Sequence, residues 1–160
     1  MIGKVKIRHL FLLAWLAALS TKAQVSSENY VQTTERISDT QVLSTTEYYD
    51  GLGRPFEMVE QKKTPDGANL IHLKEYDGLG RDWKTWLPVK DASDFLSISA
   101  ARSQGNNQYR DSHAFSLTVY DGSPLNRINT VEGVGAEWTS HPLKKDYLVN
   151  TSKYPLNCKY

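Results

Sequence analysis

The sequence predicts an all-β, mainly antiparallel fold in which β-hairpins follow one another along a twisted ribbon. A six-residue segment, Tyr-Asp-Gly-Leu-Gly-Arg, occurs at residues 49–54 and again at 76–81, 27 residues later. Runs rich in β-branched and aromatic residues flank both copies, and residues 115–119 alternate apolar with polar side chains, as half-buried strands do. A duplicated segment of this kind is typical of repeat architectures.

The repeated segment has the chemistry of a tight turn. Type I turns favour Asp at the first position and Gly at the fourth, which Asp50 and Gly53 satisfy. The carboxylate can accept from a backbone N–H two residues later, and glycine takes positive φ without a Cβ clash. We expect Tyr49 and Arg54 to oppose each other across a four-residue loop, with the guanidinium on the ring. The motif residues are Tyr49, Asp50, Gly51, Gly53 and Arg54, then Tyr76, Asp77, Gly78, Gly80 and Arg81.

A looser third copy starts at Tyr120, Asp121 and Gly122, 44 residues after the second, and reaches its arginine at Arg127. There the arginine follows the tyrosine by seven positions rather than five, because residues 123–126 lengthen the turn. This copy therefore departs from the hairpin periodicity of the first two.

Strands are expected on either side of each turn. They cover residues 41–48 and 55–59 around the first copy, 70–75 and 83–87 around the second, and 115–119 before the third. At most one short helix is expected, near residues 92–102, with Asp91 or Ser93 as its N-cap, and residues 105–108 predict a loop. Residues 24–40 form a polar N-terminal extension with one short strand at 30–34.

The first 23 residues have the pattern of an export signal. Basic residues at positions 4, 6 and 8 precede an unbroken apolar run over 10–19, and residues 21–23 form a small-x-small cleavage site before Gln24. The apolar run is too short to span a bilayer as a helix, which takes about 20 residues. We therefore expect a secreted, periplasmic or cell-surface protein, cleaved after Ala23, with no stable membrane insertion afterwards.

Charge and cysteine usage limit the partners and the source of stability. Residues 1–23 hold four of the 19 basic residues and no acid, so the mature chain carries 15 − 18 = −3 charges. Binding to nucleic acid needs clustered Lys and Arg, which the chain lacks, and no nucleic-acid partner is expected. The single cysteine, Cys158, cannot form an internal disulfide, so stability must come from a core or from neighbouring repeats.

The two full copies match the Tyr-Asp repeat of the RHS family, in which Tyr-Asp is followed by two residues and Gly-Arg. The wider order is more specific: an export signal, Asn-Tyr-Val at 29–31, and Tyr-Asp-Gly-Leu-Gly-Arg-Pro at 49–55. Ser-Pro-Leu-Asn-Arg at 123–127, followed by Trp138 and His141, continues it. Over residues 28–148 the chain resembles the N-terminal domain of unknown function that opens large Bacteroidetes-type RHS-repeat proteins.

The resemblance implies an architecture and a partner. RHS proteins build long β-ribbons that spiral into a hollow shell, which often encloses a toxic or variable C-terminal domain. We expect a signal peptide at 1–23, an extension at 24–40, and a Tyr-Asp-repeat-like β domain at 41–160 that is truncated at its C-terminus. The expected partners are then the downstream RHS repeats of the same parent chain.

Catalytic and metal-binding patterns are weak. Asp111-Ser112-His113 holds the residue types of a triad, but consecutive residues on a strand alternate between faces. The histidines of the mature chain lie far apart with one cysteine, and the Asp-Gly pairs lack the alternating oxygen ligands of a calcium loop. We expect no enzyme activity, no cofactor and no metal.

The expected function is a non-catalytic leader segment that supplies the first strands of an RHS-type shell. The alternative is an extracellular carbohydrate-binding module, possible partners being glycans stacked on Trp83, Trp86 and Trp138. Against that alternative, Trp83 and Trp86 would serve to pack a sheet.

Overall fold

The computed structural model describes residues 28–148, and the predicted export signal, its cleavage site and Cys158 lie outside this range. The strands are β1 (Asn29–Arg36), β2 (Val42–Tyr49), β3 (Pro55–Glu60), β4 (Asn69–Tyr76), β5 (Asp82–Trp86), β6 (Val89–Asp91), β7 (Phe115–Tyr120), β8 (Ile128–Glu132) and β9 (Leu143–Lys144). One α-helix, α2 (Ile98–Tyr109), interrupts them between β6 and β7. A short 3₁₀ segment, Ala136–Ser140, follows β8.

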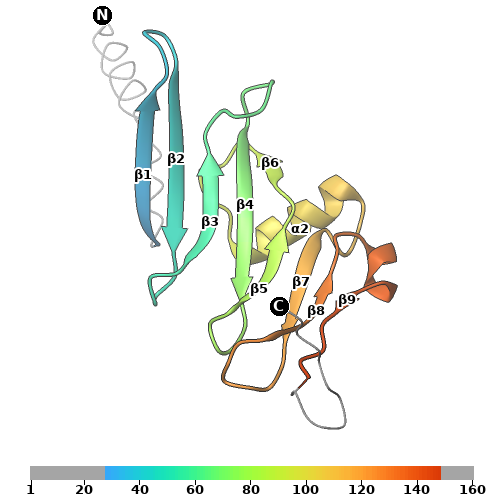
Figure 1. The fold of residues 1–160 in the computed structure, drawn as a ribbon. Helices are drawn as coiled ribbons and strands as arrows, with labels where there is room; N and C mark the ends of the chain where they lie inside the picture. Colours follow the sequence, from blue (N-terminus) through green and yellow to red (C-terminus); the bar gives the residue numbers. More distant parts are fainter. Residues whose placement is uncertain (1–27, 149–160) are drawn as a thin grey trace, which may run out of the picture.

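The strands form one open, twisted antiparallel sheet in which the main path follows chain order, β1-β2-β3-β4-β5-β7-β8-β9 (Figure 1). Every pairing is antiparallel, so the predicted all-β fold of consecutive hairpins is confirmed. The strands predicted beside the three turns agree with the observed ones to within one residue at each end. The strand predicted at 30–34 is longer, because β1 pairs with β2 along all eight of its residues.

Two short strands share one side of β4. β5 pairs with the C-terminal part of β4, where Lys74 lies opposite Thr85, and β6 pairs with its N-terminal part, where Ile71 lies opposite Val89. The chain between β5 and β6 therefore bends away from a single straight strand at Leu87 and Pro88. After β6 the chain leaves the sheet, forms α2, and returns as β7 beside β5.

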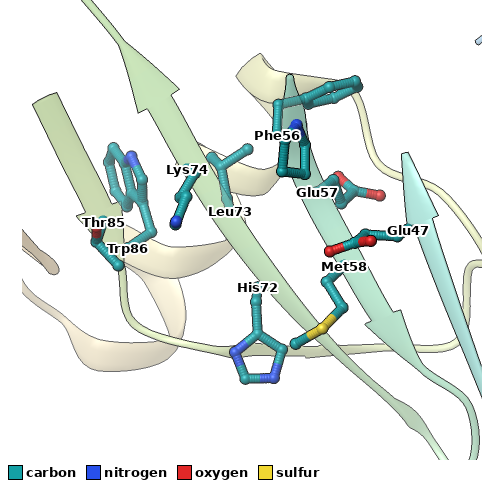
Figure 2. A pocket seen from close by; sticks show the side chains of 10 residues that line it. Glu47, Phe56, Glu57, Met58, His72, Leu73, Lys74, Thr85 and Trp86 are labelled. Carbon is teal, nitrogen blue, oxygen red and sulfur yellow. The ribbon is translucent and has the colours of Figure 1, made fainter. Parts of the chain in front are cut away.

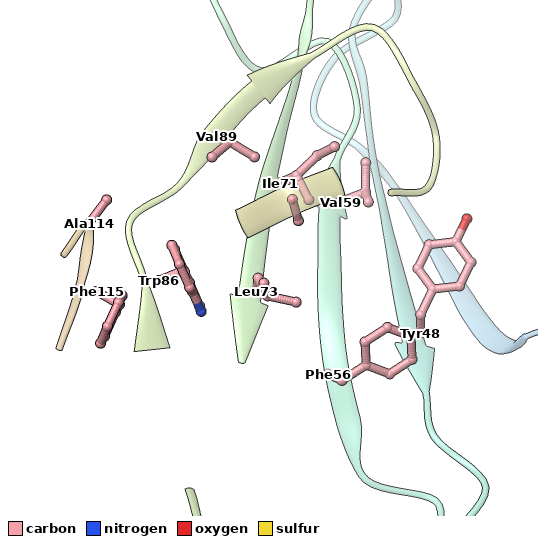
Figure 3. Packing of buried hydrophobic residues seen from close by; sticks show 10 residues of the cluster. Tyr48, Phe56, Val59, Ile71, Leu73, Trp86, Val89, Ala114 and Phe115 are labelled. Atoms are coloured by element: carbon pink, nitrogen blue, oxygen red, sulfur yellow. The ribbon is translucent and has the colours of Figure 1, made fainter. Parts of the chain in front are cut away.

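The core lies between one face of the sheet and the segment that contains α2 (Figure 3). Alternation along β4 places Ile71 and Leu73 on this face, where they are 0 % and 2 % exposed, while His72 between them is half-buried. The remaining buried apolar residues are Tyr48, Phe56, Val59, Trp86, Val89, Ala101, Ala114 and Phe115.

The helix begins and ends later than the sequence predicted. Asp91 is not its N-cap, because Asp91 ends a strand and its carboxylate accepts from the Ser93 N–H at 2.8 Å. Ser97 caps the helix instead, accepting from the Ala100 N–H. The loop predicted at 105–108 is wrong, since these residues are helical. Gly105 has a packing role there: a Cβ would lie 3.3 Å from the Trp86 ring.

Candidate functional site: a clasp between repeat units

Three repeat units, each a strand, a turn and a strand, succeed one another along the sheet. Unit 1 is β2 and β3, unit 2 is β4 and β5, and unit 3 is β7 and β8. The first strands of the units run in the same direction, so the three turns lie at the same end of the sheet (Figure 1). The sequence motif therefore marks one row of turns.

The turn of each full copy is a three-residue loop closed by its aspartate and arginine. The Gly53 N–H donates to the Asp50 carbonyl at 2.9 Å, and the Asp50 N–H donates to the Arg54 carbonyl at 3.0 Å. Gly53 has φ 76°, the left-handed position of a type I turn with a glycine bulge. The second copy repeats both bonds, between Gly80 and Asp77 and between Asp77 and Arg81, each at 2.9 Å.

The aspartate holds its turn through side-chain bonds. One oxygen of Asp50 accepts from the backbone N–H groups of Leu52 and Arg54, both at 2.9 Å, and the other accepts from Arg54 Nε at 2.8 Å. The Arg54 backbone N–H, then its guanidinium, lower the pKa of Asp50 below the ordinary value. Asp77 makes the same bonds, and those from Arg81 lower its pKa in the same way.

The expected pairing of Tyr49 with Arg54 is wrong. Tyr49 lies opposite Pro55, and Arg54 closes the loop with Asp50. The reason is the three-residue loop together with a β-bulge, in which Phe56 is the extra residue between Pro55 and Glu57. Equivalent bulges follow the other two turns, where Trp83 and Asn129 are the extra residues.

The third unit tolerates its longer turn because an asparagine replaces the second glycine. Asn126, directly before Arg127, has φ 52°, a conformation that Asn adopts more readily than most residues. The Asp121 N–H donates to the Arg127 carbonyl at 2.8 Å, and Arg127 Nε donates to Asp121 Oδ2 at 2.8 Å. The hairpin, its ion pair and the bulge after it are thus kept.

Each arginine stacks on the tyrosine of the following unit. Arg54 Cζ lies 4.5 Å from the centre of the Tyr76 ring, and Arg81 Cζ lies 4.4 Å from that of Tyr120. The tyrosine also binds back: the Tyr76 hydroxyl donates to the Pro55 carbonyl at 2.6 Å, one residue after the arginine. Likewise the Tyr120 hydroxyl donates to the residue after Arg81, at 2.9 Å. We call this arrangement of arginine, its aspartate and the next tyrosine the inter-unit clasp.

A constant register produces the clasps. In each case the residue three positions after the arginine pairs with the residue three positions before the tyrosine. These pairs are Glu57 with Leu73, Lys84 with Leu117, and Thr130 with Lys144. The third pair leads to Tyr147, whose ring centre lies 5.0 Å from Arg127 Cζ. The same relation therefore holds three times.

Sequence reasoning missed Tyr147, although a signal was available. Tyr147 follows Tyr120 by 147 − 120 = 27 residues, the spacing between Tyr49 and Tyr76. It lacks a following Asp-Gly, so the Tyr-Asp-Gly motif does not include it. At the other end, Asn29 of β1 lies opposite Tyr49, so the first tyrosine faces an amide where the later ones face a guanidinium.

Gly80, unlike Gly53, is needed for space as well as for its backbone conformation. A Cβ on Gly80 would lie 2.7 Å from Arg54 Nη1, whereas a Cβ on Gly53 would meet no atom within 4 Å. The glycine of one unit thus leaves room for the guanidinium of the unit before it. A residue with a side chain at this position would strain the turn and displace the clasp.

A family comparison covers the whole row of units. The family described as a domain of unknown function, DUF6443, matches residues 20–150. The chain belongs to this family. No curated protein and no solved structure matches the chain. In this DUF6443 domain the match extends over all three repeat units, β1 and Tyr147.

The three tryptophans of the DUF6443 domain have different surroundings. Trp86 is 6 % exposed, donates from Nε1 to Glu75 Oε1 at 2.7 Å, and packs 4.7 Å from the Phe115 ring centre. Its ring is therefore a core group and has no face open to a sugar. Trp83 is 37 % exposed beside Lys84, and Trp138 is 59 % exposed in the 3₁₀ segment. The structure does not bring the three rings together on one element.

Figure 2 shows a pocket beside β2 to β5, in which Glu47, His72 and Lys74 have partners and the buried Glu57 does not have one for its Oε2. Glu47 accepts from the Tyr49 hydroxyl at 2.5 Å. His72 Nε2 lies 3.1 Å from Glu60 Oε2, and Lys74 Nζ lies 3.2 Å from an oxygen of Asp82. The pairing leaves these side chains occupied in structural contacts.

Asp111, Ser112 and His113 form no catalytic arrangement in the described structure. The Asp111 carboxylate accepts from the backbone N–H groups of His113, at 2.7 Å, and Ala136, at 3.0 Å. The His113 ring stacks 4.0 Å from the Phe115 ring centre. Over residues 28–148, no group of three metal-ligating side chains occurs, and no helix there is long and apolar enough to cross a bilayer.

One buried carboxyl group lies apart from the clasps. Glu57, in β3, is 1 % exposed, and its Oε1 accepts from the Leu96 N–H at 3.0 Å. Its Oε2 has no hydrogen-bond partner among the described residues. Burial raises the pKa of Glu57 to about 7, against the lowering by the Leu96 bond. Glu57 thereby ties the sheet to the segment that leads into α2.

Proposed function

We propose that this DUF6443 domain is the non-catalytic opening segment of an exported RHS-type repeat protein. Its role is to supply the first strands of a β-shell, onto which the downstream repeats of the same parent chain add. The shell encloses a toxic or variable C-terminal domain. In this proposal the clasp sets the register of each added unit.

The direction of the clasp is the observation that carries the proposal. Each clasp joins the arginine of one unit to the tyrosine of the next, so it specifies addition at one side of the sheet only. Tyr147 already takes the tyrosine position towards Arg127, at 5.0 Å. Tyr147 therefore stands where the first strand of a fourth unit would end.

Nearest-neighbour stabilisation is expected of such units, because each buries its surface against the next. α2 packs mainly on unit 2 and β6, and β9 is only two residues long, so the last unit has the least cover. We expect the domain alone to unfold at a lower temperature than the same domain with a further unit attached.

The test adds a fourth unit. The residues after Tyr147 are replaced by a copy of residues 77–87, which follow Tyr76 in unit 2. The expected result is a higher melting temperature and stronger hydrogen-exchange protection of β8 and β9, since β9 gains a neighbour. The matched control carries the same graft with its Asp and Arg changed to Ala, which removes the turn and ion pair. If both grafts leave the melting temperature alike, the proposal is wrong.

Export is tested separately. The full chain, expressed in a bacterium with its own first 23 residues, is expected outside the cytoplasm with Gln24 as its first residue. Mass spectrometry of the N-terminal peptide provides the measurement. An uncleaved chain retained in the cytoplasm would contradict the exported role and leave the clasp unaffected.

A further inference from the structure

The first strand of the sheet has an edge without a neighbour in the described structure. β1 (Asn29–Arg36) pairs with β2 on one side through eight consecutive residue pairs without a register shift. All eight residues are exposed. In an antiparallel pair, the backbone N–H and C=O groups of alternate residues point away from the partner strand. β1 therefore presents a row of such groups along its whole length.

The edge lacks the features by which sheets usually discourage pairing. Natural edges are shortened, bulged, or interrupted by proline or inward-pointing charges. β1 is straight in register, contains neither Pro nor Gly, and its central residues, Val31 to Thr34, carry no charge. The opposite edge, β9, is two residues long. The edge that can form a long ladder is thus the first one.

β1 is also fixed differently from the other strands. Its position opposite Tyr49 is held by Asn29, so the clasp found at the later interfaces is replaced here. Its side-chain ties to β2 include Gln32 Nε2 to Ser44 Oγ at 3.2 Å and the Tyr30 ring, 5.7 Å from the Tyr48 ring centre. These contacts all lead to β2, so the outer backbone edge of β1 has no partner within residues 28–148.

We propose that β1 pairs antiparallel with β1 of a second copy of this chain, with the two Thr33 residues opposite each other. The two sheets then continue as one through the dimer axis. This proposal is independent of the proposed shell function, because the downstream repeats would add at β9.

The register follows from the side chains of β1. With Thr33 on the axis, opposed residues have numbers that sum to 66, so Tyr30 lies opposite Arg36 of the second copy. The chain makes the same cross-strand contact, an arginine on a tyrosine ring, at three places within one copy. The two-fold axis produces this contact twice, and directly opposed side chains lie close enough to stack.

Charge does not oppose the pairing. Glu35 and Arg36 stand side by side at one end of β1, so the strand brings both signs to the interface. In the chosen register Glu35 faces Val31 of the second copy, and no two like charges are directly opposed. A single pair of strands buries little area, so the dimer is expected to be weak and concentration-dependent.

A charge exchange at Thr33 tests the pairing in the full protein. Sedimentation velocity of the unaltered chain should show a dimer that forms as concentration rises. Thr33→Lys and Thr33→Glu should each abolish it, because like charges meet on the axis, and an equimolar mixture of the two variants should restore a heterodimer. Equal melting temperatures of the separate variants at low concentration would show that β1 itself is intact.

A control at the other edge separates the two surfaces. Leu143→Lys and Leu143→Glu, in β9, should leave the dimer unchanged. A monomer at all concentrations, or an assembly lost in the Leu143 variants and kept in the Thr33 variants, overturns the proposal. The second result would place self-association at the last edge instead.

Cross-linking reads the register. In a Cys158→Ser background, which removes the single native cysteine, Thr33→Cys should give a disulfide dimer, since opposed antiparallel residues have suitable Cα separations. Val42→Cys, on the interior strand β2, is the matched exposed control and should give none. If the Gln32→Cys variant cross-links and the Thr33→Cys variant does not, opposed residues have numbers that sum to 64. That register would overturn the Tyr30–Arg36 contact.

Discussion

The guanidinium of Arg54 stacks on the ring of Tyr76, with 4.5 Å between Cζ and the ring centre, although Tyr49 is the tyrosine of its own motif. Arg54 is also ion-paired with Asp50 at 2.7 Å, so its guanidinium contacts both its own turn and the next unit. Through this contact the motif joins one repeat unit to the next.

The coupling between Arg54 and Tyr76 can be measured by a double-mutant cycle with Arg54→Gln and Tyr76→Leu. We expect a coupling free energy of about 0.5–1 kcal/mol in chemical unfolding, the range for a partly exposed cation–π pair. The control cycle pairs Arg54→Gln with Tyr49→Leu and should give no coupling. A coupling with Tyr49 equal to that with Tyr76 would restore the within-unit pairing that the sequence suggested.

Two glycines in equivalent turns should differ in their tolerance of a methyl group. Gly53→Ala and Gly80→Ala both place alanine at positive φ, 76° and 80°, at a cost of about 1–2 kcal/mol. Gly80→Ala should destabilise the protein further, because its Cβ would lie 2.7 Å from Arg54 Nη1. Adding Arg54→Ala should bring the two costs together. If both substitutions lower the free energy of unfolding equally while Arg54 is present, the Arg54 side chain moves aside without destabilising the protein.

The hairpins could be predicted from the sequence because their signals are local. The Asp50 carboxylate reaches only as far as Arg54, and strands on either side follow from composition. The tyrosine that the arginine contacts could not be predicted in this way. It depends on a bulge at Phe56 and on the register between separate units. The helix was misplaced for a similar reason: Gly105 looks like a helix end, yet it faces Trp86 across the core.

Part of the candidate site could therefore be predicted. The turn residues are evident from the sequence, and Tyr147 could have been found from the repeated spacing of 27 residues. That Asn29 stands at an arginine position emerges only from the β1–β2 register. Likewise, the burial of Trp86 depends on α2, which arrives from the insertion between units 2 and 3.

Asn29→Arg should add a fourth stack of an arginine on a tyrosine ring, without the aspartate of a full clasp. Asn29 lies opposite Tyr49, and a Cβ on Gly53 meets nothing within 4 Å, so the ring and the space beside the glycine are open to a guanidinium. We expect a gain of about 0.5 kcal/mol in the free energy of unfolding, measured at low protein concentration. Asn29→Lys provides the matched cation without the planar head. The gain should vanish in a Tyr49→Leu background, and a gain that persists there would have another origin.

Glu57 should make the domain less stable as the pH rises through neutrality. Its folded pKa is raised to about 7, from an ordinary value of 4.5. A raised folded pKa means that the folded state holds the proton more tightly, so the contribution is fully present below pH 4.5 and is lost as the pH rises towards and past 7. Between about pH 5 and pH 8 the expected loss is about 2 kcal/mol.

The variant Glu57→Gln isolates this effect because its amide keeps an acceptor for the Leu96 N–H and carries no charge. Its unfolding free energy, measured by urea titration at several pH values, should lack the slope and exceed that of the unaltered chain at pH 8. Lowered pKa values of Asp50 and Asp77 act in the opposite sense, since they remove stability only as the pH falls below about 4. The comparison therefore belongs between pH 5 and 8, and equal slopes for both chains there would exclude Glu57 as the titrating group.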